Sequence, residues 1–147
     1  MKIIAWSLLI AVTTILLAIS ICQPYYLSDT GNSFFREFVT HEMLAVLGVI
    51  VTITLASAAS IHLELNKLEE RTGAGFPDAR RAVKLSSYAL VLTFGAAFFI
   101  VMAKPWVGDG LHATAAMNSL SILTFMFSLA IMADLTMAIF RIPAIRK

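Results

Sequence analysis

The sequence predicts an all-α integral membrane protein, a four-transmembrane-helix bundle that forms a single domain over residues 1–147. The chain is 59% hydrophobic and 14% charged, whereas a soluble domain is about 45–50% apolar and about 25% charged. Four apolar stretches approach the roughly 20 residues that a helix needs to cross the hydrocarbon core. The basic residues gather on one side of the predicted bundle, as membrane topology requires.

The four predicted spans cover approximately residues 3–22, 43–61, 85–103 and 116–140. The first apolar run is longer than the roughly 7–15 residues of a signal-peptide core, and no clear A-x-A cleavage site follows it. We therefore interpret it as a retained span. The single cysteine, Cys22, excludes an intramolecular disulfide framework.

The orientation follows from the placement of lysine and arginine. One side of the predicted bundle carries nine basic residues: Lys2, Lys67, Arg71, Arg80, Arg81, Lys84, Arg141, Arg146 and Lys147. The opposite side carries Arg36 and Lys104. Because cytoplasmic loops are enriched in Lys and Arg, both termini are predicted to be cytoplasmic, in a plasma or inner membrane. Termini on the same side require an even number of spans, which agrees with four.

The connection between the first two spans predicts a short interfacial helix. It opens with Gln23-Pro24, which stops the first span, and then places Phe34, Phe35 and Phe38 on one helical face. In the connection between the third and fourth spans, Pro105 is expected to end the third span and Trp106 to anchor at the interface.

The connection between the second and third spans predicts a helical cytoplasmic hairpin. Leucines interleaved with charged residues extend the second span by two or three turns, and residues 72–77 form a turn. Asp78 then lies in the first turn of a renewed helix, or caps it. Arg80, Arg81 and Lys84 are expected at the lipid headgroups, where they serve as topology and lipid anchors or form a docking or anion-binding site.

Small and polar residues predict how the helices associate, because apolar burial alone cannot drive association in lipid. In the second span Gly48, Thr52, Ala56 and Ser60 recur every four residues and predict a packing face. Gly95 marks a second place of close approach, in the third span.

The fourth span carries a polar stripe. At 100° per residue, its members fall within about one third of the helix circumference. They are Asn118, Ser121, Thr124 and Ser128. Their side chains either bond to helix carbonyls and neighbouring helices or line a wetted path in an oligomer. Asn118 is the strongest member, since a primary amide in lipid must find partners.

Asp134 is the only ionisable residue well inside a predicted span, and such residues are functional candidates. It forms an ion pair with a basic residue near the cytoplasmic end, or it is a proton or cation site. It does not lie on the polar stripe of the fourth span.

His41 and His112 lie on the outer side together with Asp109, and they are either interfacial residues or ligands of a metal or haem. Their spacing matches no HxxxH or CxxCH motif, so no cofactor is predicted. The chain also lacks GxSxG, HExxH and P-loop motifs, and its net charge of +2 is too small to indicate a nucleic-acid partner.

These observations favour a non-catalytic subunit of a homo- or hetero-oligomeric membrane complex, with membrane lipids and other membrane chains as partners. Two alternatives remain open at this point. One is an oligomeric channel lined by the fourth span and Asp134. The other is an electron-transfer subunit associated with haem or quinone through His41 and His112.

Overall fold

A computed structural model describes residues 2–73 and 75–140. Five α-helices and one short 3-10 helix make up this part of the chain. In order they are α1 (Lys2–Cys22), η1 (Pro24–Leu27), α2 (Ser33–Phe38), α3 (His41–Thr72), α4 (Pro77–Val107) and α5 (Leu111–Phe140). The all-α class is confirmed, and so is a short helix in the first connection. The 3-10 helix was not predicted.

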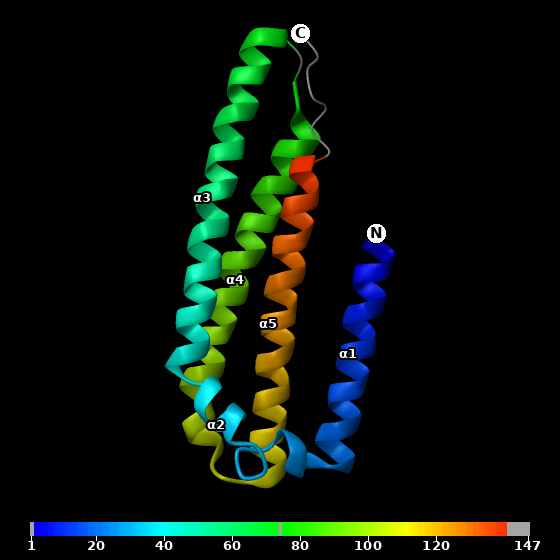
Figure 1. Ribbon diagram of the computed structural model, residues 1–147, viewed down its shortest axis with the longest axis vertical. Helices are drawn as coiled ribbons and strands as arrows, with labels where there is room; N and C mark the ends of the chain where they lie inside the picture. Colours follow the sequence, from blue (N-terminus) through cyan, green and yellow to red (C-terminus); the bar gives the residue numbers. More distant parts are fainter. Residues whose placement is uncertain (1, 74, 141–147) are drawn as a thin grey trace.

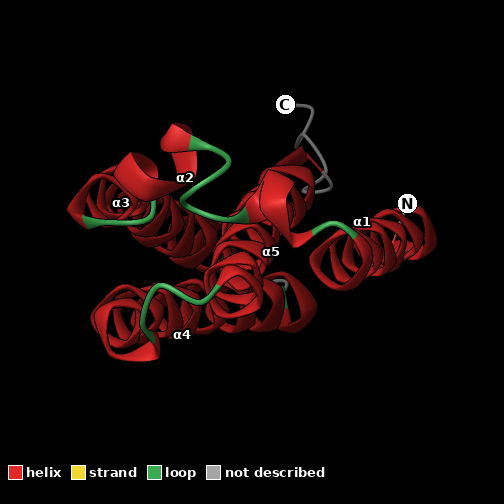
Figure 2. Cartoon of the chain, turned by 90° about the horizontal axis from the view of Figure 1, so that it is seen from below, coloured by secondary structure: helices red, strands yellow, loops and turns green. Residues whose placement is uncertain are grey.

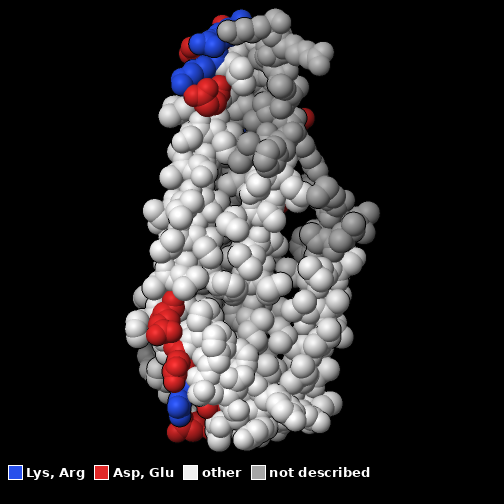
Figure 3. All heavy atoms as spheres, in the orientation of Figure 1, with Lys and Arg blue, Asp and Glu red and all other residues white. Residues whose placement is uncertain are grey.

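Three helices are long and apolar enough to cross a membrane: α3, α4 and α5, the last judged over Leu111–Met137. α1 supplies a shorter apolar helix, judged over Trp6–Cys22. Many large apolar side chains on these helices are exposed, as expected for a surface that contacts lipid. Figure 3 shows charged residues at both ends of the visible face and an uncharged band between them. The chain is an integral membrane protein.

α5 is the central helix of the structure. It packs against α4 most extensively and also against α1, η1 and α3. α3 lies against α4 and α2, whereas α1 lies against α5 and η1. Viewed along the helices, α1 and α3 occupy opposite edges with α5 between them (Figure 2). The helices therefore form an open arrangement, in which α1 is an outer member rather than part of a closed bundle.

The two ends of the molecule differ in composition and are named here by their content (Figure 1). The hairpin end contains the α3–α4 connection, and the end of α5 lies on its side of the molecule, whereas α1 points toward this end but starts well short of it. The loop end contains η1, α2 and the α4–α5 connection. α3, α4 and α5 run along most of the molecule, whereas α1 runs along only the part nearer the loop end.

Local sequence explains where α4 begins and ends. Pro77 occupies the first turn, where its missing N–H leaves no helical bond unmade. At the other end, the prediction that Pro105 stops the helix is wrong, because α4 continues to Val107. Pro105 lies in the last turn, where it removes only one helical hydrogen bond. Gly108, with φ of 76°, follows as the C-terminal cap instead.

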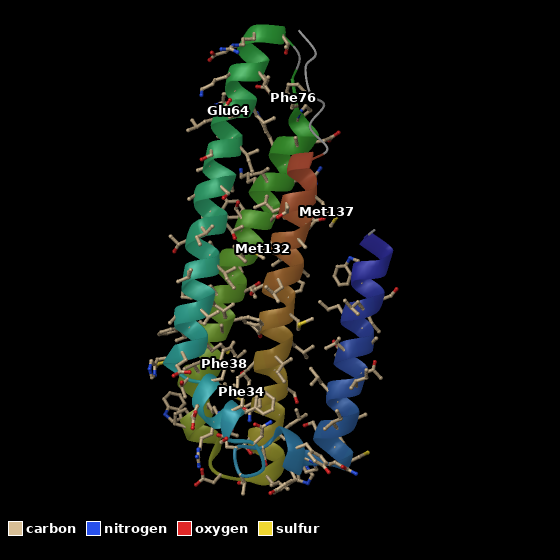
Figure 4. All side chains as sticks on the ribbon, viewed as in Figure 1. Phe34, Phe38, Glu64, Phe76, Met132 and Met137 are labelled. Atoms are coloured by element: carbon tan, nitrogen blue, oxygen red, sulfur yellow. The ribbon has the colours of Figure 1, made fainter. Side chains whose placement is uncertain are left out.

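The predicted helical hairpin is present and is held by polar contacts between α3 and α4. Arg80 pairs with Glu69 and Asn66 of α3. The second carboxylate oxygen of Glu69 accepts a hydrogen bond from the backbone N–H of Phe76 at 2.9 Å. Glu69 therefore holds both the backbone at the start of α4, through Phe76, and a side chain of its first turns, through Arg80. In Figure 4, Phe76 lies at this end of the molecule, close to the tip of the hairpin.

The face that α3 buries within the chain differs from the one its small residues predict. The buried residues of α3 are Met43, Leu47, Thr54, Ala58 and Leu65. Thr52, Ala56 and Ser60 are exposed, and Gly48 is half-buried beside Phe94. The four-residue spacing does mark one face of α3, but this face is not the one that α4 covers. Thr52, Ala56 and Ser60 are therefore open to contacts from outside the chain.

Candidate functional site

A buried side-chain amide near the start of α5 connects this helix to the segment that follows α1. Asn118 is fully buried, with 0% of its surface exposed. Its Nδ2 donates to the carbonyl oxygen of Leu27 and to Oδ1 of Asp29, both at 2.7 Å. Within residues 2–73 and 75–140, its Oδ1 has no hydrogen-bond partner. As predicted, this amide finds partners, and they come from the η1–α2 connection.

Lys104, from the end of α4, reaches the same carboxylate. Its Nζ lies 3.0 Å from Asp29 Oδ1 and 3.1 Å from the carbonyl oxygen of Phe35, to which it donates. The side chains of Lys104 and Asp29 are 11% and 23% exposed. We call Asp29, Lys104 and Asn118 the loop-end cluster. Charge-assisted hydrogen bonds of this kind are roughly twice as strong as neutral ones, so the cluster ties α4, α5 and the first connection to one another.

A tight turn holds Asp29 in position. The hydroxyl of buried Ser28 donates to the Tyr25 carbonyl at 2.9 Å and accepts from the Gly31 N–H at 3.2 Å. The chain then passes so close to Tyr25 that a Cβ on Gly31 would lie 2.0 Å from the carbonyl oxygen of Tyr25. No side chain fits at that distance, so Gly31 is required by the close approach of two backbone segments.

We therefore expect Gly31→Ala to lower the free energy of unfolding by about 1–3 kcal/mol, the usual penalty for overpacking. Gly95→Ala is the matched control, since a Cβ built on Gly95 has no side chain of a non-adjacent residue and no other helix within 4 Å. Alanine is a better helix former than glycine by about 1 kcal/mol, so this control should be neutral or stabilising. Thermal unfolding in detergent, followed by circular dichroism, measures both. Equal stability of the two variants would contradict the expectation.

The short helix α2 is fixed beside the loop-end cluster by aromatic packing. Phe34 and Phe38 stack with ring centroids 5.0 Å apart and project together from α2 (Figure 4). Phe38 also meets Phe125 of α5 edge to face at 6.0 Å. Asn32 caps the helix by accepting from the Phe34 N–H at 3.0 Å. This packing places Arg36, which lies on the same helix, near the ends of α3 and α4.

A pocket of about 340 Å³ opens next to the cluster. Charged and titratable side chains from five segments line it. They are Asp29, Arg36, His41, Lys104 and Asp109. Val101 and Pro105 of α4 supply an apolar wall. The pocket thus brings together charged and titratable side chains of the loop end.

The predicted histidine pair is only partly associated with this pocket. His41 lines it together with Asp109, but His112, at the start of α5, does not. Both histidines are exposed. In the described ranges, no group of three or more His, Cys, Asp or Glu side chains is arranged to hold a metal ion. His41 therefore lines a polar pocket. The geometry does not support the hypothesis that His41 and His112 together bind a metal or haem.

The polar stripe of α5 faces protein in this chain. Asn118, Ser121, Thr124 and Ser128 are all buried. The three hydroxyls donate to the helix carbonyls of Met117, Leu120 and Thr124 at 2.8–3.0 Å. These contacts satisfy the hydroxyls inside α5 and let neighbouring helices approach closely. Thr124 also lines an open apolar groove of about 470 Å³ that lies between α1, α4 and α5.

Asp134 and the basic residues of the hairpin do not join the loop-end cluster. Asp134 is half-buried on α5, and none of the described side chains forms a hydrogen bond or ion pair with it. Arg141, two turns further on, lies outside the described residues. Arg81 and Lys84 are exposed, and Lys84 Nζ lies 5.8 Å from the Tyr88 ring centroid. Arg80 instead faces α3.

Sequence reasoning recognised Asn118 but missed its charged partner Asp29, and it also missed Lys104, which pairs with Asp29. Asp29 was not singled out, and Lys104 was used only to count charge. A usable signal did exist, because all three residues were predicted at the same membrane face. A buried amide there, with one acid and one base close to span ends, requires satisfaction by whichever polar groups can reach it.

The comparisons with known proteins add no relative to this description. No protein-family model, curated protein or solved structure matches the chain.

Proposed function

We propose that the protein is a non-catalytic, four-span subunit of an oligomeric membrane complex. The observation that carries the proposal is the exposed small-residue face of α3. Thr52, Ala56 and Ser60 lie on the surface of the single chain, on a helix long and apolar enough to cross a membrane. Small residues at four-residue spacing let two helix backbones approach closely.

The length of α1 supports its assignment as the fourth span. α1 has 21 residues, and at about 1.5 Å per residue it is about 32 Å long. This length matches a hydrocarbon core of about 30 Å. It also runs lengthwise beside the part of α5 that lies nearer the loop end (Figure 1).

The charge distribution supports a cytoplasmic hairpin end. The hairpin carries Lys67, Arg71, Arg80, Arg81 and Lys84, whereas the loop end carries Arg36 and Lys104. By the positive-inside rule the hairpin faces the cytoplasm. The start of α1 and the end of α5 both point toward the hairpin end, although α1 stops well short of it (Figure 1).

Leucine substitution on α3 tests the subunit proposal. We expect the particle extracted from membranes to exceed the 16.0 kDa of one chain, and Ala56→Leu to reduce it to one chain by blocking close approach. Ser57→Leu is the matched control, because Ser57 is exposed on the adjacent part of the same helix. Native mass spectrometry measures the mass and identifies any partner.

Two results would contradict the proposal. One is a wild-type particle of a single chain under conditions that retain native lipid. The other is an identical loss of assembly in Ala56→Leu and Ser57→Leu, which would mean that the small-residue face has no special part in assembly.

A further inference from the structure

We propose that the loop-end pocket binds the headgroup of a phosphatidylethanolamine-type lipid, with the phosphate at Arg36, His41 and Lys104 and the ammonium at Asp109. The inference goes beyond the subunit proposal. It depends on the loop end lying at a membrane face, and it does not depend on oligomerisation.

Several N–H donors on the basic side of the pocket are not used by contacts within the described part of the chain. An ammonium carries three N–H donors, and two of those on Lys104 are used by Asp29 Oδ1 and the Phe35 carbonyl. Arg36 and His41 are exposed, line the same pocket and form no ion pair with any acid in the described ranges. Arginine is suited to phosphate because its planar fork can donate two parallel hydrogen bonds.

The acidic side makes a simple anion a poor fit. Asp29 is engaged by Lys104 and Asn118, so its charge is balanced inside the protein. Asp109 is different, since it is exposed, lines the pocket and pairs with no base in the described part of the chain. A headgroup with both a phosphate and a primary amine complements this pair of opposite charges. A quaternary ammonium has no N–H to donate to Asp109, and a glycerol headgroup has no positive charge.

The surroundings place the pocket where a lipid headgroup would lie. Val101 and Pro105 form its apolar wall on α4, and Trp106, which follows directly, is 84% exposed. Exposed tryptophan is typical of the membrane interface. Further along α4, Phe98, Phe99 and Met102 are exposed and offer an apolar surface for acyl chains. A volume of about 340 Å³ falls within the range of about 300–1,000 Å³ found for ligand pockets.

Native mass spectrometry of the full chain in detergent tests the proposal. The protein is titrated with phosphatidylethanolamine, phosphatidylcholine and phosphatidylglycerol that share the same acyl chains. We expect the ethanolamine lipid to be retained best. Arg36→Gln and Asp109→Asn should each weaken its retention about fivefold, the effect of one exposed charged contact of about 1 kcal/mol. Arg71→Gln removes an exposed charge at the hairpin end and should leave retention unchanged.

A second measurement separates a lipid from a soluble phosphate ester. The thermal midpoint of the lipid-free protein is recorded with inorganic phosphate, with phosphoethanolamine and with the ethanolamine lipid. We expect only the lipid to raise the midpoint, and only while Arg36 and Asp109 are present. An equal rise with phosphoethanolamine would overturn the lipid assignment. Equal retention of the three lipids, or retention unaffected by Arg36→Gln and Asp109→Asn, would overturn the site itself. None of these outcomes depends on the mass of the assembled particle.

Discussion

Replacing Asn118 by leucine is expected to lower the free energy of unfolding by about 2–4 kcal/mol, because it leaves the Leu27 carbonyl without a donor and removes one of the two donors to Asp29. The substitution keeps the side-chain volume nearly constant, so little of the loss should come from a cavity. It removes the donors to the Leu27 carbonyl and to Asp29 Oδ1, both at 2.7 Å. Because Asn118 is fully buried, water cannot readily replace these hydrogen bonds.

The control for this prediction is Ser121→Ala, one turn further along α5. Ser121 is also buried, but its hydroxyl donates to the Met117 carbonyl of its own helix. When the hydroxyl is removed, this carbonyl can still accept its backbone hydrogen bond within the helix. We expect a change of about 0.5 kcal/mol or less, since the helix bond that this carbonyl accepts remains. Reversible unfolding of the detergent-solubilised protein, followed by circular dichroism, compares the two. Similar losses for both variants would mean that the contacts of Asn118 to the first connection contribute no specific stability.

The long helices were predictable because their signal is local. A run of apolar residues specifies a span wherever the rest of the chain lies, so α3, α4 and α5 each contain the predicted stretch. The hairpin extension also has a local signal in its leucines and turn. The end of α4 shows the limit of this reasoning. A proline in the last turn of a helix need not end it, and α4 continues past Pro105 to the cap at Gly108.

The arrangement of the helices was less predictable, because it depends on contacts between distant residues. Lys104 and Asp29 are separated by 75 positions, and Asn118 and Asp29 by 89, and no periodicity links such pairs. The small residues of α3 identified a face without stating which neighbour covers it. The polar stripe of α5 was identified from the sequence as a set of residues on one face, and both of its interpretations fitted the sequence. Only the burial of Ser121 and Ser128 shows that the stripe faces protein in this chain.

The second large effect is expected from Lys104→Met, which removes the positive charge beside Asp29. We expect a loss of about 2–4 kcal/mol in the free energy of unfolding, somewhat below the roughly 3–5 kcal/mol for breaking a fully buried ion pair. The reduction follows from the 23% exposure of the Asp29 side chain, which allows some solvation of its carboxylate. Methionine preserves most of the length and apolar stem of lysine, so the change reports mainly on the charge.

A double-mutant cycle separates the ion pair from ordinary packing. Asp29→Asn alone leaves the Lys104 ammonium without a counter-ion, and it should also destabilise the protein. In Asp29→Asn/Lys104→Met neither charge remains, and the side-chain carbonyl of the new asparagine can still accept from Asn118. We therefore expect the double variant to be more stable than the sum of the single losses implies, by about 1–3 kcal/mol. Additive losses would show that Lys104 and Asp29 do not stabilise each other, and the 3.0 Å contact between them would then not be what joins α4 to the first connection.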